Sequence, residues 1–448
     1  MLTRVAVVVE PSERAAEREP AVAHADLVLA GATDGANFAT DLAAPLGPTP
    51  ADLPPLALDM VDLAAAVYLT DIAVARGRLE EWTRSISLAA PVRRPDFWNA
   101  AATDFRALLY NLTHDNFEVT FYQRPDVPGP EGADVLPADF EPDCVCMLSG
   151  GVDSLAGAVT LQTGGRSPMY AMHRSGNPAV LTAQGRVLGA IEGHWPEACG
   201  FAPYHVAPHT TERSLPFPAA EEREPSRRAR SLLFLAVAEA AAVACGVDEV
   251  FMFENGVLSA ALPLTLARAG SMSTRSTHPT LLRGFNGLCE RAGLAPRVTN
   301  PFIYQTKADL VRDVLRPALS PAEVQGTVSC WATGRANRQC GGCVPCLLRR
   351  IAMLHAGLPD EAYMVDVLAE PARYAGTDAY GNLMDVLRSA RDMLEGSDDE
   401  ILVSRPGLVA LEAAGISSRE IILMFRRHAE QVRDVLACHF PQAAKLME

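Results

Sequence analysis

One short loop constrains the fold of this chain more than any other feature. Residues 149–154 read Ser-Gly-Gly-Val-Asp-Ser, directly after an apolar run at residues 144–148 and before a helical stretch. A strand that ends in such a turn and opens a helix gathers backbone N–H groups, two hydroxyls and the positive end of a helix dipole around one point. Gly150 and Gly151 allow the tight turn and the close approach of an oxyanion. The loop predicts an anion site and is not a Walker A loop, because the chain contains no Gly-Lys-Ser/Thr.

Short apolar runs and helical stretches alternate beyond this loop. Such repetition of strand and helix indicates a parallel α/β sheet. The strand candidates are residues 144–148, 169–173, 202–206, 249–253 and 297–302, and the helix candidates are 154–162, 181–192 and 231–245. The longest apolar run, residues 231–247, is interrupted by Glu239 and is shorter than a membrane span, so it predicts a buried helix.

Breaker residues divide the chain. The densest cluster of prolines and glycines predicts a linker at residues 126–142. Before it, residues 1–125 are expected to form a small α+β domain with a helix at 60–74 and strands at 84–92 and 117–124. Residues 143–358 are expected to form the main α/β domain, and residues 359–448 a helical region that includes 418–438.

Charge and composition exclude several classes. The chain has 448 residues, and 39 Lys and Arg against 54 Asp and Glu give a net charge of −15. Proteins that bind nucleic acid or anionic membranes without specificity carry a positive face. Neither direct nucleic-acid binding nor membrane binding is therefore expected. The N-terminal apolar stretch is too short for a signal peptide, which predicts a cytoplasmic protein. Its ten cysteines are then expected to be reduced thiols or metal ligands.

Four of these cysteines have metal-ligand spacing. Cys330, Cys340, Cys343 and Cys346 form a C-x9-C-x2-C-x2-C array. Four thiolates make a closed tetrahedral Zn²⁺ site with no open position for water, so the sequence predicts a structural zinc. An iron–sulfur cluster and free thiols are the competing interpretations. The other six cysteines are interpreted as core or isolated residues.

The Ser-Gly-Gly-Val-Asp-Ser loop resembles the SGGxDS pyrophosphate loop of the N-type ATP pyrophosphatase (PP-loop) superfamily. Together with the cysteine array it resembles the 7-cyano-7-deazaguanine synthases, or QueC family, over residues 143–355. The resemblance implies an α/β fold of the HUP (adenine nucleotide alpha hydrolase-like) type, with a parallel sheet and a four-cysteine zinc loop, joined to the N-terminal α+β domain and the C-terminal helices. It also implies ATP as co-substrate and Mg²⁺.

Departures from the typical synthase point to a subgroup. Residues 254–256 and 273–279, together with the additional N-terminal domain, are similar to the QueC-like proteins of anti-phage operons, notably QatC. The resemblance implies adenylation of a carboxylate of the 7-carboxy-7-deazaguanine type, leading to an amide, a nitrile or a conjugate. The alternatives are a housekeeping synthase of queuosine biosynthesis, a tRNA-modifying enzyme of the same superfamily, and a nucleotide-binding scaffold. Partners are expected to be ATP, a small-molecule acid and proteins of a defence operon.

The resemblance also implies roles for individual residues. The loop Ser149, Gly150, Gly151, Val152, Asp153 and Ser154 is expected to bind pyrophosphate, with Asp153 also placing Mg²⁺. Lys307, one of only two lysines, is the candidate for a contact with the α-phosphate, or else an exposed helix lysine. The candidates for binding phosphate or substrate are Arg228, Arg230, Glu254, Asn255, Arg275 and His278. Each has a simpler interpretation as a solvated helix start, a cap or a turn residue.

Overall fold

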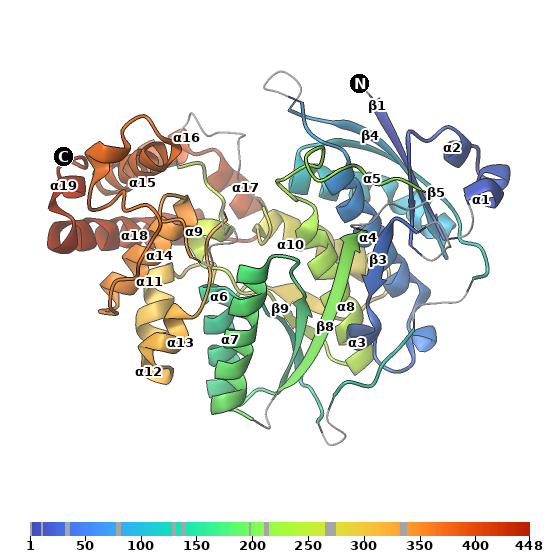
Figure 1. Ribbon diagram of the computed structural model, residues 1–448, viewed down its shortest axis with the longest axis horizontal. Helices are drawn as coiled ribbons and strands as arrows, with labels where there is room; N and C mark the ends of the chain where they lie inside the picture. Colours follow the sequence, from blue (N-terminus) through green and yellow to red (C-terminus); the bar gives the residue numbers. More distant parts are fainter. Residues whose placement is uncertain are drawn as a thin grey trace.

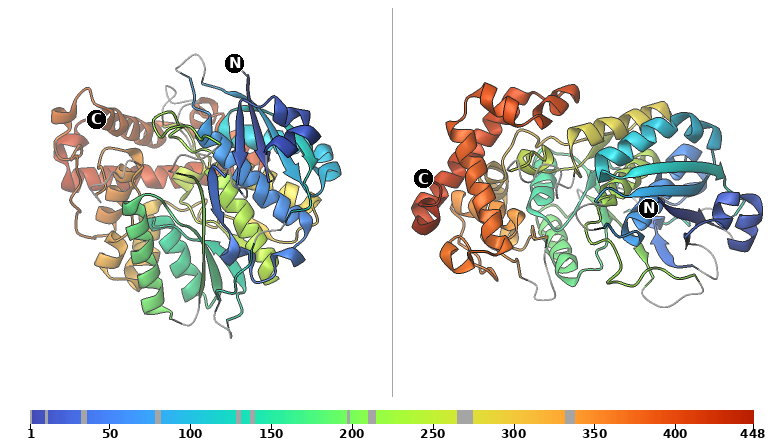
Figure 2. Two further views of the ribbon diagram at one scale, coloured as in Figure 1. Left: turned by 45° about the vertical axis from the view of Figure 1, so that its right-hand side comes forward. Right: turned by 90° about the horizontal axis from the view of Figure 1, so that it is seen from above.

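The computed structural model describes residues 2–9, 12–31, 36–77, 82–127, 131–136, 140–196, 199–209, 215–264, 275–331 and 338–448. A sheet formed by the N-terminal residues lies at one end of the molecule (Figure 1). A second sheet lies in the middle, and the C-terminal helices lie at the other end, as the view from above also shows (Figure 2).

The N-terminal sheet has four strands in the order β2-β1-β4-β5, and every pair is parallel. The alternation predicted for its last strand is present, with Phe117 and Phe121 buried. Parallel strands need crossover connections, which here include α4 (Pro55–Ala73) and α5 (Pro95–Thr113), a helix that the sequence analysis does not predict. This part is therefore α/β, which corrects the predicted α+β arrangement. The strands are β1 (Leu2–Val8), β2 (Leu27–Ala30), β4 (Ser85–Val92) and β5 (Asn116–Gln123).

The second sheet has six strands in the order β10-β9-β6-β7-β8-β3. The five strands from the middle of the chain are parallel, and all five predicted apolar runs form them. The sixth, β3, comes from the N-terminal residues and pairs antiparallel with β8. The strands are β3 (Phe38–Asp41), β6 (Cys144–Met147), β7 (Pro168–His173), β8 (Gly200–Pro208), β9 (Glu249–Phe251) and β10 (Arg297–Thr299).

One hydrophobic core joins the two sheets. Helices α4 (Pro55–Ala73) and α8 (Arg230–Cys245) pack against each other, and the same cluster of buried residues includes strands of both sheets. Both helices are apolar around most of their circumference, as helices inside a core must be. The described residues of the linker at 126–142 form neither helix nor strand, but the domain boundaries remain a prediction.

The other helices complete the layers. Those before the second sheet are α1 (Ser12–Arg18), α2 (Pro20–Ala23), α3 (Ala43–Leu46), the 3-10 helix η1 (Pro50–Asp52) and α5 (Pro95–Thr113). Those within the middle part are α6 (Val152–Thr163), α7 (Pro178–His194), α9 (Gly256–Ser259), α10 (Pro279–Arg291), α11 (Lys307–Asp309), the π-helix η4 (Leu310–Leu315), α12 (Arg316–Ala318), α13 (Pro321–Gln325) and α14 (Val344–His355). The C-terminal ones are η5 (Pro371–Tyr374), α15 (Asp378–Glu395), α16 (Asp398–Ser404), α17 (Gly407–Ala413), α18 (Ser418–His439) and α19 (Pro441–Ala444).

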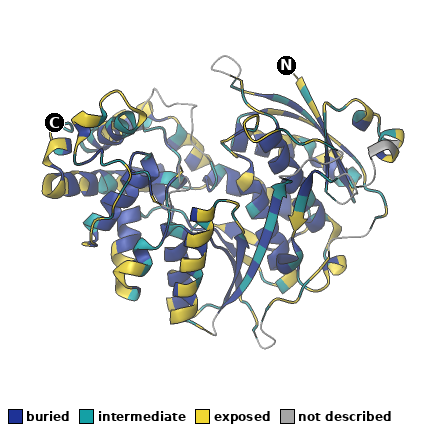
Figure 3. Ribbon diagram, in the orientation of Figure 1, coloured by how far each residue is buried: buried dark blue, intermediate teal, exposed yellow. Residues whose placement is uncertain are grey.

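Burial follows these layers (Figure 3). Helix α8 is buried as predicted, and Glu239 within it is 1% exposed. The C-terminal helices α15 and α18 form a separate hydrophobic core with α14 and α9. Within the described residues, no helix combines the length and the hydropathy that crossing a membrane requires.

Candidate functional site

The Ser-Gly-Gly-Val-Asp-Ser loop lies at the carboxyl end of β6 and opens helix α6. Its position in the sheet is distinctive, because β6 pairs with β7 on one side and with β9 on the other. The chain therefore reverses its order of strands beside this loop, which is where open α/β sheets bind ligands. The first N–H groups of α6 have no acceptor within the helix, so they face this point.

The two serine hydroxyls brace the loop. Ser149 Oγ and Ser154 Oγ are 2.8 Å apart, and Ser154 Oγ also donates to the carbonyl oxygens of Ser149 and Gly151, each at 3.1 Å. The N–H of Gly151 donates to Ser149 Oγ at 3.1 Å. The loop is thus fixed by its own side chains, as a preformed anion site requires.

Glycine at position 150 is required by packing. A Cβ atom there would lie 2.9 Å from the Cβ of Ala183 and 2.9 Å from the N of Gln184, both in α7. The carbonyl of Gly150 accepts a hydrogen bond from Val328 N at 2.7 Å. The loop is therefore held between α7 and the segment that leads to the cysteine array.

Asp153 joins three segments that are distant in sequence. Its Oδ2 accepts a hydrogen bond from Lys307 Nζ and one from Asn255 Nδ2 at 3.2 Å. Lys307 is buried, with 4% of its side chain exposed, so it is not a surface lysine. Asp153 Oδ1 is buried and has no hydrogen-bond partner among the described residues. A carboxylate oxygen left in this way fits the ligand set that Mg²⁺ prefers.

Glu254 lies beside this group. Thr277 Oγ1 donates to its carboxylate, and the backbone of Glu254 is held by Asn300, which accepts from its N–H at 3.2 Å and donates to its carbonyl at 2.9 Å. Burial, assisted by Asp153, raises the pKa of Glu254 to about 7 against the opposing effects of Thr277 and Lys307. The carboxyl group therefore changes charge near neutral pH.

Arg228 and Arg230 do not reach the loop through any hydrogen bond or ion pair in the described part of the chain. Arg228 is 4% exposed, and its guanidinium carbon lies 4.8 Å from the ring centroid of Trp82 in the N-terminal part. Its Nε is buried and has no partner among the described residues. Arg230 is exposed, with its guanidinium carbon 5.6 Å from the ring centroid of Phe234.

The remaining predicted residues are His278 and Arg275. His278 caps helix α10 by accepting from Thr280 N at 3.2 Å, which is the simpler of its two interpretations. Burial and the charge of Arg275 lower the pKa of His278 to about 4. Burial, with Arg275 and Arg228 next in effect, also lowers the pKa of His114 to about 4. The charges of Arg228 and Arg275 therefore both lower the pKa of His114, which belongs to the N-terminal residues. Residues 273–274 of the predicted segment lie outside the described residues.

The four predicted cysteines lie together. The Sγ atoms of Cys330, Cys340, Cys343 and Cys346 all lie within 4.8 Å of one another. The distances are 3.8 Å between Cys340 and Cys346 and 4.0 Å between Cys343 and Cys330. Four sulfurs bound at about 2.3 Å around one tetrahedral ion would be about 3.8 Å apart. The Cys340–Cys346 and Cys343–Cys330 distances are therefore close to the spacing of a tetrahedral zinc site.

The turns of this cluster need glycine. Gly341 has φ +82°, and a Cβ there would lie 2.1 Å from the carbonyl oxygen of Val365. Cys330 follows Val328 by two residues, and Val328 is bound to Gly150 of the Ser-Gly-Gly-Val-Asp-Ser loop. A metal in the cluster would thus fix one wall of the anion site.

Two important residues, in a segment whose sequence resembles the QueC family's Thr-Lys-acidic segment, were assigned no role from the sequence. Asn300 holds Glu254, and Asp309 forms a capping box with Thr306 at the start of the helix that carries Lys307. The Thr-x-x-Asp pattern at 306–309 was a local signal for the cap. No local signal indicated the partners of Asp309 in α18, because they lie more than a hundred residues further along the chain.

Comparisons with known proteins agree with this arrangement. The family model described as "Queuosine biosynthesis protein QueC" matches residues 276–357. A 7-cyano-7-deazaguanine synthase from an Anaeromyxobacter species is 29% identical over 241 residues, which cover 49% of this chain and 95% of that protein. The synthase of Thiobacillus denitrificans is 25% identical over 250 residues, covering 53% and 100%.

Other relatives match over a shorter region. The synthase of Nitrosococcus oceani is 26% identical over 138 residues, which cover 30% of this chain and 55% of the relative. The chain thus spans about half the length of that relative. No solved structure matches the chain significantly.

Proposed function

We propose that this chain, which is similar to QueC proteins, is a PP-loop protein that uses ATP to activate a carboxylic acid for reaction with a nitrogen nucleophile. The observation that carries the proposal is the meeting of Asp153, Asn255 and Lys307 at a braced phosphate loop. The loop offers backbone donors and two hydroxyls, and Lys307 adds a buried ammonium group. These are the groups that stabilise a departing pyrophosphate.

The proposed reaction has two steps. A carboxylate oxygen of the acid attacks the α-phosphorus of ATP, the bond to the β-phosphate breaks, and pyrophosphate leaves into the loop. Ammonia or an amine then attacks the acyl carbon, and AMP leaves as an amide forms. In this scheme Lys307 contacts the α-phosphate, and Asp153 would hold a Mg²⁺ ion that would supply further charge neutralisation.

The acceptor acid is assigned to the junction with the N-terminal part. Arg228 and Arg275 are charged and at least partly buried, and neither has an acidic hydrogen-bond or ion-pair partner among the described residues. Arginine suits carboxylate recognition because its donors are planar and paired. A 7-carboxy-7-deazaguanine compound is the proposed acid, since the curated relatives are named 7-cyano-7-deazaguanine synthases. Glu254 and Asn255 would line the same site.

Two cellular roles fit this chemistry. The names of the relatives favour synthesis of the nitrile itself. That role needs a second ATP, whose α-phosphorus the amide oxygen attacks with loss of pyrophosphate, so that this oxygen then leaves with AMP and the nitrogen loses its protons. The N-terminal sheet and C-terminal helices, which lie outside the match at 276–357, favour a QatC-like component of an anti-phage system that forms an amide or a conjugate. The cysteine cluster is proposed to hold a structural Zn²⁺ in either case.

Pyrophosphate release tests the proposal. The protein, ATP, Mg²⁺, ammonium and 7-carboxy-7-deazaguanine should yield pyrophosphate and AMP, and release should need the acid. The double variant Ser149→Ala, Asp153→Ala should lose at least about 100-fold in rate, because its loop lacks a hydroxyl and the partner of Lys307. Asp434→Ala, at an exposed position, is the control.

The outcomes separate the alternatives. Undiminished release by the double variant would refute the site assignment. ATP binding without release for any acid would favour the scaffold role instead. Mass spectrometry of the product distinguishes nitrile from amide or conjugate.

A further inference from the structure

The C-terminal helix α18 contacts the segment that carries Lys307. Arg427 Nε donates to Asp309 Oδ2 at 2.8 Å, and Gln431 Nε2 donates to Asp309 Oδ1 at 2.8 Å. Arg427 Nη2 also donates to the carbonyl oxygen of Tyr304 at 2.7 Å. One turn of α18 therefore binds both ends of residues 304–309.

Asp309 transmits this contact to the start of α11. Its Oδ2 accepts from Thr306 N at 3.1 Å, and its N–H donates to Thr306 Oγ1 at 3.0 Å. Burial alone would raise the pKa of Asp309, but hydrogen bonds from Thr306 and Arg427 hold it below its ordinary value. Asp309 is therefore a charged anchor, and Lys307 lies between it and Thr306 in the chain.

The opposite side of this segment is fixed by backbone contact. Gly256 N donates to Gln305 O at 2.8 Å. A Cβ at Gly256 would lie 2.1 Å from Ile303 O and 2.8 Å from the Cε of Met424 in α18. Gly256 also follows Asn255, which donates to Asp153. Helix α18 thus packs against both segments whose side chains, Lys307 and Asn255, donate hydrogen bonds to Asp153.

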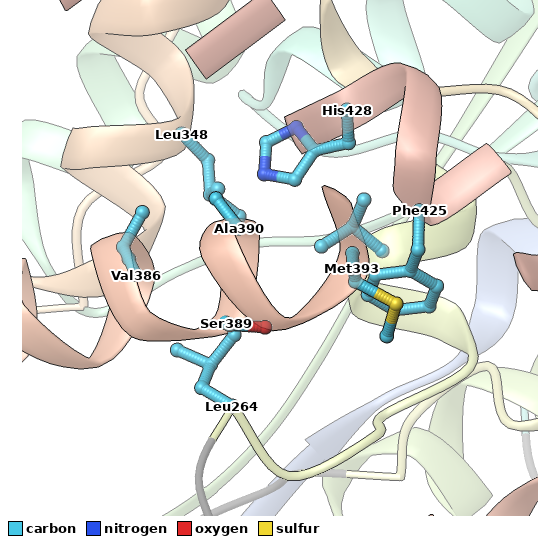
Figure 4. Close-up of a pocket in the computed structure, with 9 residues that line it drawn as sticks. Leu264, Leu348, Val386, Ser389, Ala390, Met393, Phe425 and His428 are labelled. Atoms are coloured by element: carbon cyan, nitrogen blue, oxygen red, sulfur yellow. The ribbon is translucent and has the colours of Figure 1, made fainter. Parts of the chain in front are cut away.

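Helix α18 is itself closely packed. Figure 4 shows side chains of α14, α15 and α18 around a cavity of about 10 Å³, with His428 at one wall. Such a space is no larger than one water molecule needs, so it is a packing gap and not a ligand site. The turn that carries Arg427 and Gln431 therefore has little freedom to move.

We infer that Arg427 and Gln431 are positioning residues, which hold Lys307 against Asp153 through Asp309. The effect of this positioning on catalysis rests on the proposed function. The positioning of Lys307 itself can be measured without any reaction. The C-terminal helices lie outside the QueC match at 276–357. They would thus complete the nucleotide site of this chain.

The scarcity of lysine gives a direct test. Lys307 is buried and Lys445 is exposed, and they are the only lysines. In the full-length protein, acetylation by an amine-reactive ester, followed by mass spectrometry, should modify Lys307 at least about tenfold more slowly than Lys445. The double variant Arg427→Ala, Gln431→Ala should raise the ratio of the two rates about tenfold. Arg433→Ala on the same helix, at an exposed position, should leave it unchanged.

A second measurement separates positioning from stability. In the double variant the maximal rate of pyrophosphate release should fall at least about tenfold at a temperature well below melting. If that variant does not fold, Gln431→Leu should give a smaller rise in the labelling ratio, about threefold. An unchanged ratio in a folded variant overturns the inference. Absence of pyrophosphate release by the unaltered protein overturns the proposed function alone, because the labelling ratio does not depend on activity.

Discussion

The burial of Lys307 depends on Asp153, a residue from a distant part of the chain. They are 154 residues apart and form a buried ion pair. Removing one partner of such a pair leaves an uncompensated charge in a poorly solvated place, which is strongly destabilising. Pairing therefore explains why a lysine lies inside this protein, where the sequence alone left open an exposed helix lysine.

Glu239 is a buried carboxyl group away from the site, and it predicts a pH effect. Both of its oxygens are buried, and neither accepts from an N–H or O–H group of the described residues. Burial raises its pKa from 4.5 to about 8, against the opposing effect of a hydrogen bond from the Cys289 thiol. Between these values the folded chain keeps a proton that the unfolded chain has lost, so stability falls as the pH rises through this window.

Glu239→Gln should reduce that pH dependence. The loss of unfolding free energy between pH 5 and pH 7.5 should be smaller by about 3 kcal/mol, since each pKa unit corresponds to about 1.4 kcal/mol. Denaturant unfolding at both pH values measures it. Glu290→Gln, at an exposed position, is the control and should change neither value. An equal pH dependence in the Glu239→Gln variant would contradict the explanation.

Among the elements, the segment that leads into the cysteine cluster is in contact with the Ser-Gly-Gly-Val-Asp-Ser loop. The segment that leads into the cluster binds Gly150 through Val328 N at 2.7 Å. The described residues of the loop that supplies the cysteines, 330–331 and 338–343, form neither helix nor strand, so metal binding is expected to provide much of their order. The proposed zinc is therefore expected to contribute to the proposed nucleotide binding without taking part in the reaction.

Cys340→Ser tests this coupling. The variant should lose most of its zinc, melt at a lower temperature and show a KM for ATP raised at least about fivefold, because three thiolates bind zinc less tightly than four. Elemental analysis, thermal melting and steady-state kinetics measure these three effects. Cys438→Ser, an exposed cysteine outside the cluster, should match the unaltered protein. A zinc-free variant with an unchanged KM for ATP would show that the cysteine cluster does not influence ATP binding.

At the scale of the whole molecule, the N-terminal part, residues 1–125, is packed into the second sheet and its core. Strand β3 completes the second sheet, and α4 covers α8. A buried network also crosses between the two parts, with Arg84 paired to Asp71 at 2.5 Å and to Asp115 at 2.6 Å. Asp71 in turn accepts from Ala229 N at 2.9 Å, at the start of α8. The junction that is proposed to bind the acid therefore depends on both parts.

A truncated chain tests this dependence. Residues 126–448 expressed alone should aggregate or fail to melt cooperatively, because α8 would expose the apolar face that α4 covers. Size-exclusion chromatography and circular dichroism measure both properties. In the full chain, a protease site inserted within residues 131–136 provides the comparison, since the two cleaved parts should remain associated. A monomeric, cooperatively melting fragment 126–448 would show that the N-terminal part is independent.

The sequence alone determined the features that depend on neighbouring residues. The Ser-Gly-Gly-Val-Asp-Ser turn between a strand and a helix, the four-cysteine array and the alternation of strands and helices all follow from turn geometry, ligand spacing and apolar runs within short windows. The tertiary structure decided what depends on which faces are buried together. It made the N-terminal sheet parallel, joined it to the second sheet through α4 and α8, and placed Arg228 against Trp82. It also brought Lys307 to Asp153 under Arg427 and Gln431, because contacts between segments more than a hundred residues apart follow from the packing of whole layers and leave no local pattern.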